Sequence, residues 1–246
     1  MDRAMAQARV ELARRIAAAH RLTILTGAGV SAASGVPTFR GADGLWRTYR
    51  PEDLATAAAF RRDPSLVWEW YAWRRGLIAD CEPNAAHLVI AEWSARDGCR
   101  VITQNVDDLH LRAGTRDLIR LHGSIWELRC WNGCGQLPWR DESLLHDDCP
   151  LCPACQGLAR PAVVWFGESL DPVDVEAAQA ACDCDVFLTI GTSAVVYPAA
   201  GLVHDAQRRG AFTAEINLEP TSASSSVDLA IHGAAEQILP ELAFTR

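Results

Sequence analysis

Nine cysteines are present, and five of them lie between positions 130 and 155. Two close pairs of thiolates can supply the four corners of a tetrahedral zinc site, so Cys130 with Cys134 and Cys152 with Cys155 predict a zinc ribbon. Four thiolates leave the ion no open position for water, which predicts a structural role. Two alternatives remain: Cys149, which forms a second Cys-x-x-Cys with Cys152, replaces a ligand, or the segment is a cysteine-rich loop without metal.

A glycine-rich turn follows the apolar segment 22–26. Gly27 and Gly29 would let the backbone approach a pyrophosphate and present amide hydrogens to it. The alternative is a tight strand-to-helix turn without a ligand. A dehydrogenase would continue with a helix and a second strand that ends in an acidic residue, but here Pro37 and two glycines interrupt that helix. The sequence therefore disfavours hydride transfer and favours a loop that covers a cofactor.

Short apolar segments and helical segments alternate along the chain. Five segments are predicted to be buried strands, namely 22–26, 100–103, 118–121, 186–191 and 212–218. Helical stretches such as 84–95 and 198–209 separate them. This alternation predicts the α/β class, with a Rossmann-like doubly wound parallel sheet.

Two segments interrupt this rhythm, a Trp-rich helical one and the cysteine-rich one, and both are predicted to form a smaller lobe. We expect the whole chain, 1–246, to be one domain. Its large lobe, which carries the glycine-rich turn, would comprise 1–36, 84–124 and 161–246, and its small lobe 37–83 and 125–160.

The composition excludes several classes of protein. The 246 residues are 49% apolar and carry a formal net charge of −8, so a broad phosphate-neutralising surface is not expected and no direct nucleic-acid partner is predicted. All 23 basic residues are arginine, which excludes a Walker lysine and a Schiff-base lysine. The N-terminal segment has no continuous apolar core, so we expect a cytoplasmic protein without a membrane partner. The oligomeric state stays open.

Six motifs give the chain a resemblance to the sirtuins, the NAD-dependent protein-lysine deacylases. They occur in the family's order: GAGVSAASGVPTFRG from Gly27, TQNVD from Thr103, LHG from Leu121, VVWFGE from Val163, GTS from Gly191 and NLE from Asn217. The resemblance spans about residues 22 to 240. The spacing of the first cysteine pair departs from the usual family pattern by one residue.

The resemblance implies a reaction and two catalytic residues, His122 and Asn105. In sirtuins the acyl oxygen of a modified lysine attacks C1′ of the nicotinamide ribose, nicotinamide leaves, and a histidine takes a proton from a ribose hydroxyl that then attacks the acyl carbon. His122 matches that histidine, and an imidazole titrates near neutral pH, where such a transfer is efficient. The alternative for His122 is a core histidine bonded to the backbone.

The resemblance also implies a set of NAD contacts. The ring of Phe39 would shield the reaction, Gln104 to Asp107 would lie at the nicotinamide end, Gly191 to Ser193 near the phosphates or the adenine ribose, and Asn217 to Glu219 near the adenosine. Asp107 and Asp108 have an alternative as a carboxylate pair at a helix N-terminus, which is the preferred interpretation for Asp108. The full set is Gly27, Ala28, Gly29, Ser31, Ala32, Phe39, Arg40, Trp46, Gln104, Asn105, Val106, Asp107, Gly191, Thr192, Ser193, Asn217, Leu218, Glu219 and Ala235.

Tyr71 and Arg74 predict the acyl group. They are spaced i and i+3 in a helical segment and share one face, where a guanidinium and a phenol suit a carboxylate. The alternative is a surface arginine beside a packed tyrosine. The segment resembles the desuccinylase and demalonylase branch, in which Tyr-x-x-Arg reads the distal carboxylate of the acyl group. Ala59 matches the small residue of that branch's roomy pocket, and Thr38 stands where many deacetylases carry an acid.

The peptide edge is predicted at Val164, Trp165, Phe166 and Gly167, where an acylated-lysine peptide or protein would add a strand through main-chain hydrogen bonds. The resulting prediction is a transferase that removes succinyl or malonyl groups, and acetyl more weakly, to give nicotinamide, free lysine and 2′-O-acyl-ADP-ribose. The alternatives are mainly deacetylation, mono-ADP-ribosyl transfer, and a non-catalytic NAD-binding module.

Overall fold

The computed structural model of the protein describes residues 3–39, 45, 48, 50–144 and 149–243. Its larger lobe is built on six parallel strands in the order β3-β2-β1-β7-β8-β9. The strands are β1 (Leu22–Thr26), β2 (Cys99–Thr103), β3 (Leu118–Arg120), β7 (Val186–Ile190), β8 (Phe212–Asn217) and β9 (Leu229–His232). The order reverses between β1 and β7, where doubly wound sheets bind their ligands. The predicted fold class is confirmed.

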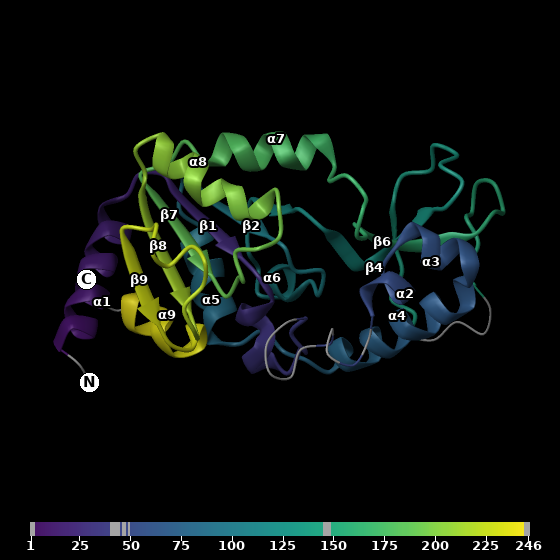
Figure 1. The fold of residues 1–246 in the computed structure, drawn as a ribbon, viewed down its shortest axis with the longest axis horizontal. Helices are drawn as coiled ribbons and strands as arrows, with labels where there is room; N and C mark the ends of the chain where they lie inside the picture. The colour runs from purple at the N-terminus through teal and green to yellow at the C-terminus, as the bar shows by residue number, and fades with distance from the viewer. Residues whose placement is uncertain (1–2, 40–44, 46–47, 49, 145–148, 244–246) are drawn as a thin grey trace.

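Helices cover both faces of this sheet (Figure 1). One face packs against α1 (Arg3–Ala18), α5 (Ala85–Ser94) and α9 (Ala235–Ala243), and the other against α7 (Pro172–Ala181), η3 (Ala199–Gly201) and α8 (Leu202–Arg208). Every residue of β1 and of β7 is buried, which explains why these strands are mostly apolar on both faces, with only threonines as their polar residues. No helix among the described residues is both long and apolar enough to cross a membrane.

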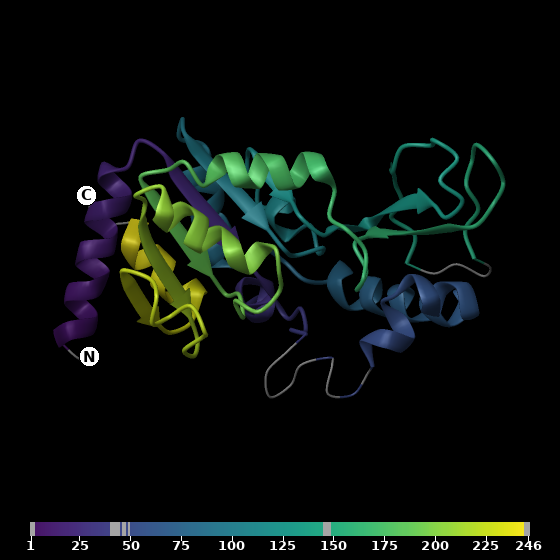
Figure 2. The same ribbon diagram turned by 45° about the horizontal axis from the view of Figure 1, so that its top comes forward.

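The smaller lobe lies at the opposite end of the molecule's long axis (Figures 1 and 2). It combines α2 (Pro51–Leu54), α3 (Ala57–Arg62) and α4 (Pro64–Ala79) with an antiparallel sheet in the order β5-β4-β6. The strands are β4 (Gly123–Cys130), β5 (Trp139–Arg140) and β6 (Ala159–Val163). This sheet begins and ends slightly outside the predicted segment 125–160.

Helix α4 is fixed at its start and along its buried face. The Asp63 carboxylate accepts a hydrogen bond from the Leu66 amide (3.0 Å), and Pro64 occupies the first turn, where its missing amide hydrogen costs nothing. Arg75 is fully buried and ties the helix to the small sheet: its guanidinium donates to the Ile125 carbonyl (2.8 Å) and to Asp141 (2.6 Å). These contacts fix the position of α4, and with it the positions of Tyr71 and Arg74 on the same helix.

Candidate active site

The glycine-rich turn crosses the turn after β7 at very short range. It leads into η1 (Ala28–Ser34), which holds Ala28, Gly29, Ser31 and Ala32. The Gly29 amide donates to the Gly191 carbonyl (2.8 Å), and a Cβ on Gly29 would lie 2.8 Å from the Gly191 Cα. Gly191 has φ +61, and a Cβ there would lie 2.5 Å from the Val30 nitrogen. Both positions therefore need glycine for packing alone, and the two turns meet, partly buried, at the switch point of the sheet.

The predicted NAD residues converge at the carboxyl ends of four adjacent strands. Gln104 follows β2, and its side-chain amide donates to Thr192 Oγ1 after β7 (2.9 Å). Asn217 at the end of β8 donates to the Thr192 carbonyl (2.8 Å), and Asn105 after β2 donates to the Gly27 carbonyl after β1 (3.1 Å). The motifs are therefore joined into one hydrogen-bonded surface.

The remaining predicted contacts lie around this surface. Ser193, Leu218 and Glu219 are exposed beside it, Val106 is partly buried against the small lobe, and Ala235 is buried at the start of α9, which contacts η1. Arg40 and Trp46 lie outside the described residues.

Asp107 lies at the centre of a buried polar network. Its carboxylate accepts from Ser31 Oγ (2.7 Å) and from the Leu109 amide (3.0 Å) at the start of α6 (Leu109–Arg112). Burial raises the pKa of Asp107, and these two hydrogen bonds lower it. Asp107 thus caps α6, whereas the Asp108 side chain makes no capping bond. The predicted place of Asp108 at a helix N-terminus is confirmed, because it is the residue that precedes α6, although its carboxylate pairs with arginines instead of capping the helix.

His122 follows β3 and is held in one tautomer. Its Nδ1 lies 2.9 Å from the Gln104 carbonyl oxygen, which can only accept, so Nδ1 carries the proton and Nε2 keeps a lone pair. Burial lowers the pKa of His122, and the Gln104 carbonyl raises it, with a net decrease. The ring is therefore a neutral base at neutral pH, beside Gln104 and Asn105.

Two further histidines, to which the sequence assigned no role, lie beneath the site. His87 Nε2 is 3.3 Å from Ser31 Oγ, and His110 Nε2 is 2.9 Å from Thr26 Oγ1, with the two rings 4.9 Å apart. Burial lowers the pKa of His87 to about 4, and burial together with His87 lowers that of His110 to about 3. A single histidine outside any motif gives no sequence signal that it will be buried against the active site.

These two pKa values predict acid sensitivity. An unfolded histidine titrates near pH 6.5, so below that pH the unfolded chain binds more protons than the folded protein and the free energy of unfolding falls. We expect a loss of about 2 kcal/mol for each ring between pH 7.5 and 5, measured by urea unfolding. His87→Gln should lose less stability over this range, while the exposed His20→Gln should behave like wild type. Equal losses in wild type and His87→Gln would contradict the assignment.

Tyr71 and Arg74 lie inside the small lobe rather than on its surface, with only 2% and 5% of their areas exposed. Tyr71 Oη accepts a hydrogen bond from Trp165 Nε1 (2.9 Å), which leaves its own hydrogen to donate. The Arg74 guanidinium lies over the rings of Phe39 (4.8 Å), Trp70 (5.0 Å) and Tyr71 (5.8 Å). The alternative of a surface arginine is therefore wrong.

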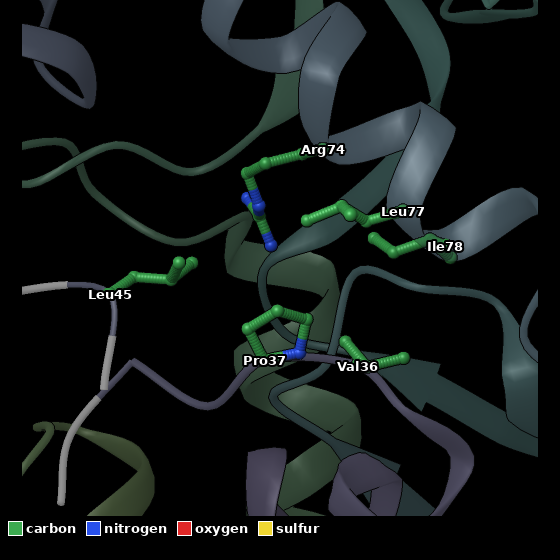
Figure 3. A pocket seen from close by; sticks show the side chains of 6 residues that line it. All are labelled: Val36, Pro37, Leu45, Arg74, Leu77 and Ile78. Carbon is green, nitrogen blue, oxygen red and sulfur yellow. The ribbon is translucent and has the colours of Figure 1, made fainter. Parts of the chain in front are cut away.

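Arg74 also lines a small pocket. Its other walls are apolar, and Figure 3 shows the guanidinium directed toward Pro37 and Leu45, away from the axis of α4. The remaining walls are Val36, Leu77 and Ile78. Among the described residues no carboxylate forms an ion pair with Arg74, and burial lowers its pKa while Tyr71 and Asp107 raise it. Ala59 is buried in α3, next to Phe60, whose ring packs on Trp165.

The predicted peptide edge joins the two lobes. The Val164 amide donates to the His122 carbonyl (3.0 Å) and the Phe166 amide to the Ala55 carbonyl (3.0 Å). Trp165 is buried, while Phe166 and Gly167 are exposed. Arg160 pairs with Glu168 through both of its terminal nitrogens (2.5 and 2.9 Å), and Glu168 also accepts from the Trp165 amide (2.9 Å), a role that was not predicted for either residue. Glu168 ends the VVWFGE motif, which was the available signal.

The four predicted zinc ligands come together. Cys130 Sγ lies 3.5 Å from Cys155 Sγ and Cys134 Sγ lies 3.6 Å from Cys152 Sγ, and all four sulfurs lie within 4.8 Å of one another. A tetrahedral zinc with 2.3 Å bonds separates its sulfurs by about 3.8 Å, so this donor set fits the ion. Cys149 is not in the cluster and its sulfur instead lies 3.7 Å from Ser65 Oγ.

Comparisons with known proteins identify the family. The Sir2 family model matches residues 27–198, which include the glycine-rich turn, the segment after β2, His122, the cysteine cluster and the turn after β7. The chain belongs to the Sir2 family. The predicted family is thus confirmed, and with it the expectation of an NAD-dependent enzyme.

Sir2 relatives match this chain over nearly its whole length. The NAD-dependent protein deacylase 2 of Pyrobaculum aerophilum is 48% identical and covers 95% of this chain and 94% of its own. A mutant Sir2 homologue solved with ADP-ribose has a TM-score of 0.91 and 44% identity, over 99% of this chain and 95% of that one. A Sir2 structure with a p53 peptide and NAD⁺ has a TM-score of 0.84 and 29% identity, over 94% and 95%. None of these names specifies the acyl group.

Proposed function

We propose that this Sir2 protein is an NAD-dependent protein-lysine deacylase that prefers succinyl and malonyl groups over acetyl groups. The observation that carries the preference is the buried Arg74 guanidinium, which has aromatic neighbours but no carboxylate partner among the described residues. A buried cation is costly unless it is paired. An acyl group that ends in a carboxylate would supply the missing anion.

Tyr71 supports the same preference through its hydrogen bond. Because its oxygen already accepts from Trp165 Nε1, its O–H is left to donate, and burial raises its pKa so that the phenol stays protonated. A guanidinium and an O–H donor one helical turn apart suit one carboxylate. Trp165 belongs to the predicted peptide edge. Its hydrogen bond to Tyr71 would therefore fix the position of Tyr71 and Arg74, the proposed carboxylate clamp, relative to the bound lysine.

The residues around Asn105 and His122 would carry the reaction. NAD supplies the ribose carbon that accepts the acyl oxygen, with nicotinamide as the leaving group. His122 Nε2 holds a lone pair and would take the proton of a ribose hydroxyl, because its Nδ1–H is fixed on Gln104. Asn105 is held by the Gly27 carbonyl and Ser31 Oγ and would orient the nicotinamide end. The products would be nicotinamide, free lysine and 2′-O-acyl-ADP-ribose.

The test is a paired assay on one peptide that carries succinyl-lysine or acetyl-lysine. We expect the succinyl peptide to have the higher kcat/KM. Arg74→Met should lower kcat/KM for the succinyl peptide by about 30-fold or more, the cost of removing one partner of a buried charge pair, with a much smaller effect on the acetyl peptide. Liberated nicotinamide and free lysine are followed together.

Arg62→Met is the matched control, because Arg62 is an exposed arginine on the neighbouring helix α3. It should leave the succinyl preference intact. If wild type prefers the acetyl peptide, the proposed clamp is wrong.

Deacetylation is the second candidate activity. Five of the six residues that line the Arg74 pocket are apolar, and such walls would accept the methyl of an acetyl group. A wild-type preference for the acetyl peptide, unchanged by Arg74→Met, would favour it.

A further inference from the structure

A cluster of four charged residues lies between the two lobes. Asp108, at the start of α6, has its side chain only 3% exposed and forms ion pairs with Arg140 of β5 and with Arg120 of β3 (3.7 Å). Arg120 also pairs with Glu127 of β4 (2.9 Å), which stands opposite Arg140 in the β4–β5 register. Two acids and two arginines from four elements are therefore linked by ion pairs, with Asp108 as the buried member, and Arg140 also pairs with the exposed Glu142.

Three consecutive residues after β2 are held by the small lobe. The Val106 carbonyl accepts from the Ile125 amide (2.9 Å), the Asp107 carbonyl accepts from Trp126 Nε1 (3.1 Å), and the Asp108 carboxylate accepts from Arg140 Nη1. The first two contacts come from β4 and the third from β5. The segment that carries Gln104 to Asp107 is thus fixed from outside the parallel sheet.

Asp108 needs this support for two reasons. It has a left-handed backbone with φ +63, a conformation that costs a non-glycine residue energy and persists only when its surroundings hold it. Its carboxylate also follows that of Asp107, which is itself buried, and like charges in one buried place repel. Arg140 supplies the nearest opposing charge, while Arg120 is farther away and shared with Glu127.

We propose that Arg140 is a positioning residue for NAD: its ion pair with Asp108 holds the Gln104–Asp107 segment in the conformation that binds the nucleotide. Strand β5 of the small lobe thereby contributes to nucleotide affinity through Asp108. This inference rests on the proposed function only in taking that segment as part of the NAD site. It does not depend on the choice of acyl group.

The test measures ADP-ribose binding by calorimetry, without acylated peptide. Arg140→Met should raise the Kd for ADP-ribose about tenfold, within the range of coupling between linked sites. Arg140→Lys keeps the cation and should recover most of the affinity. Glu142→Gln is the control, because Glu142 is an exposed partner of the same arginine, and its Kd should stay within about twofold of wild type.

A double-mutant cycle separates positioning from general stability. Asp108→Asn combined with Arg140→Met should bind ADP-ribose no worse than the weaker single variant, since both changes remove one interaction. Additive losses, an unchanged Kd in folded Arg140→Met, or an Arg140→Lys variant as weak as Arg140→Met would overturn the proposal. The comparison of succinyl and acetyl peptides is a separate assay. The proposed acyl preference can therefore fail while the role of Arg140 holds, and the role of Arg140 can fail while the acyl preference holds.

Discussion

His122→Ala is expected to lower kcat for NAD-dependent deacylation by about 10³-fold, the effect of removing a positioned general base. The variant should still bind ADP-ribose, because the hydrogen bonds that join Gln104, Asn105 and Asp107 to Thr192, Gly27 and Ser31 do not involve the imidazole. Single-turnover release of free lysine measures the loss, and calorimetry with ADP-ribose measures the retained binding. The exposed His20→Ala is the control and should match wild type.

The same histidine predicts the acid limb of the pH profile. His122 acts as a base only when neutral, and burial lowers its pKa. Activity should therefore fall with decreasing pH at a value below about 6.5, the ordinary pKa of an imidazole. The plot of kcat/KM against pH reports this value for the free enzyme. A wild-type rate retained by His122→Ala would show that another group takes the proton.

Cys152→Ser is expected to abolish stoichiometric zinc and to unfold the small lobe. Cys152 is fully buried and belongs to the four-sulfur cluster, and a structural zinc site contributes directly to folding. Cys149→Ser is a matched control three residues away, because the Cys149 sulfur is not in the cluster. It should keep one zinc per chain and the wild-type melting temperature.

Metal analysis and thermal unfolding of the two variants decide this point. Loss of zinc from Cys149→Ser but not from Cys152→Ser would reverse the ligand assignment. A chelator should reproduce the Cys152→Ser result in the wild-type protein, with a lower melting temperature. If the chelator removes zinc without any change in unfolding, the structural role is wrong.

The features that could be predicted from the sequence are those that a short, continuous segment of residues determines. Fully buried strands such as β1 and β7 are mostly apolar segments, and the glycines of the turns that follow them are required by the contact of two backbones, so their positions could be predicted. The cysteine cluster followed from the spacing of its two pairs. The edge strand β9 was missed because it is short and only one of its four residues is buried.

Contacts between distant elements could not be predicted. Asp108 and Arg140 are 32 positions apart, and neither lies in a sequence pattern that predicts an ion pair between them. The burial of Arg74 depends on Phe39, Trp70 and Tyr71 packing around it, whereas helical spacing showed only a shared face. His87 and His110 likewise reach the site only through the assembly of α5 and α6 against η1 and β1.

Three buried cations of the small lobe are arginines and not lysines, which makes these positions resistant to acylation. Arg74, Arg75 and Arg160 are all desolvated, and each lies over an aromatic ring. An amine at these positions could lose its proton on burial and become a nucleophile that reactive acyl donors modify, whereas a guanidinium keeps its charge and does not. The buried cation positions of this deacylase would thus not become acylated themselves.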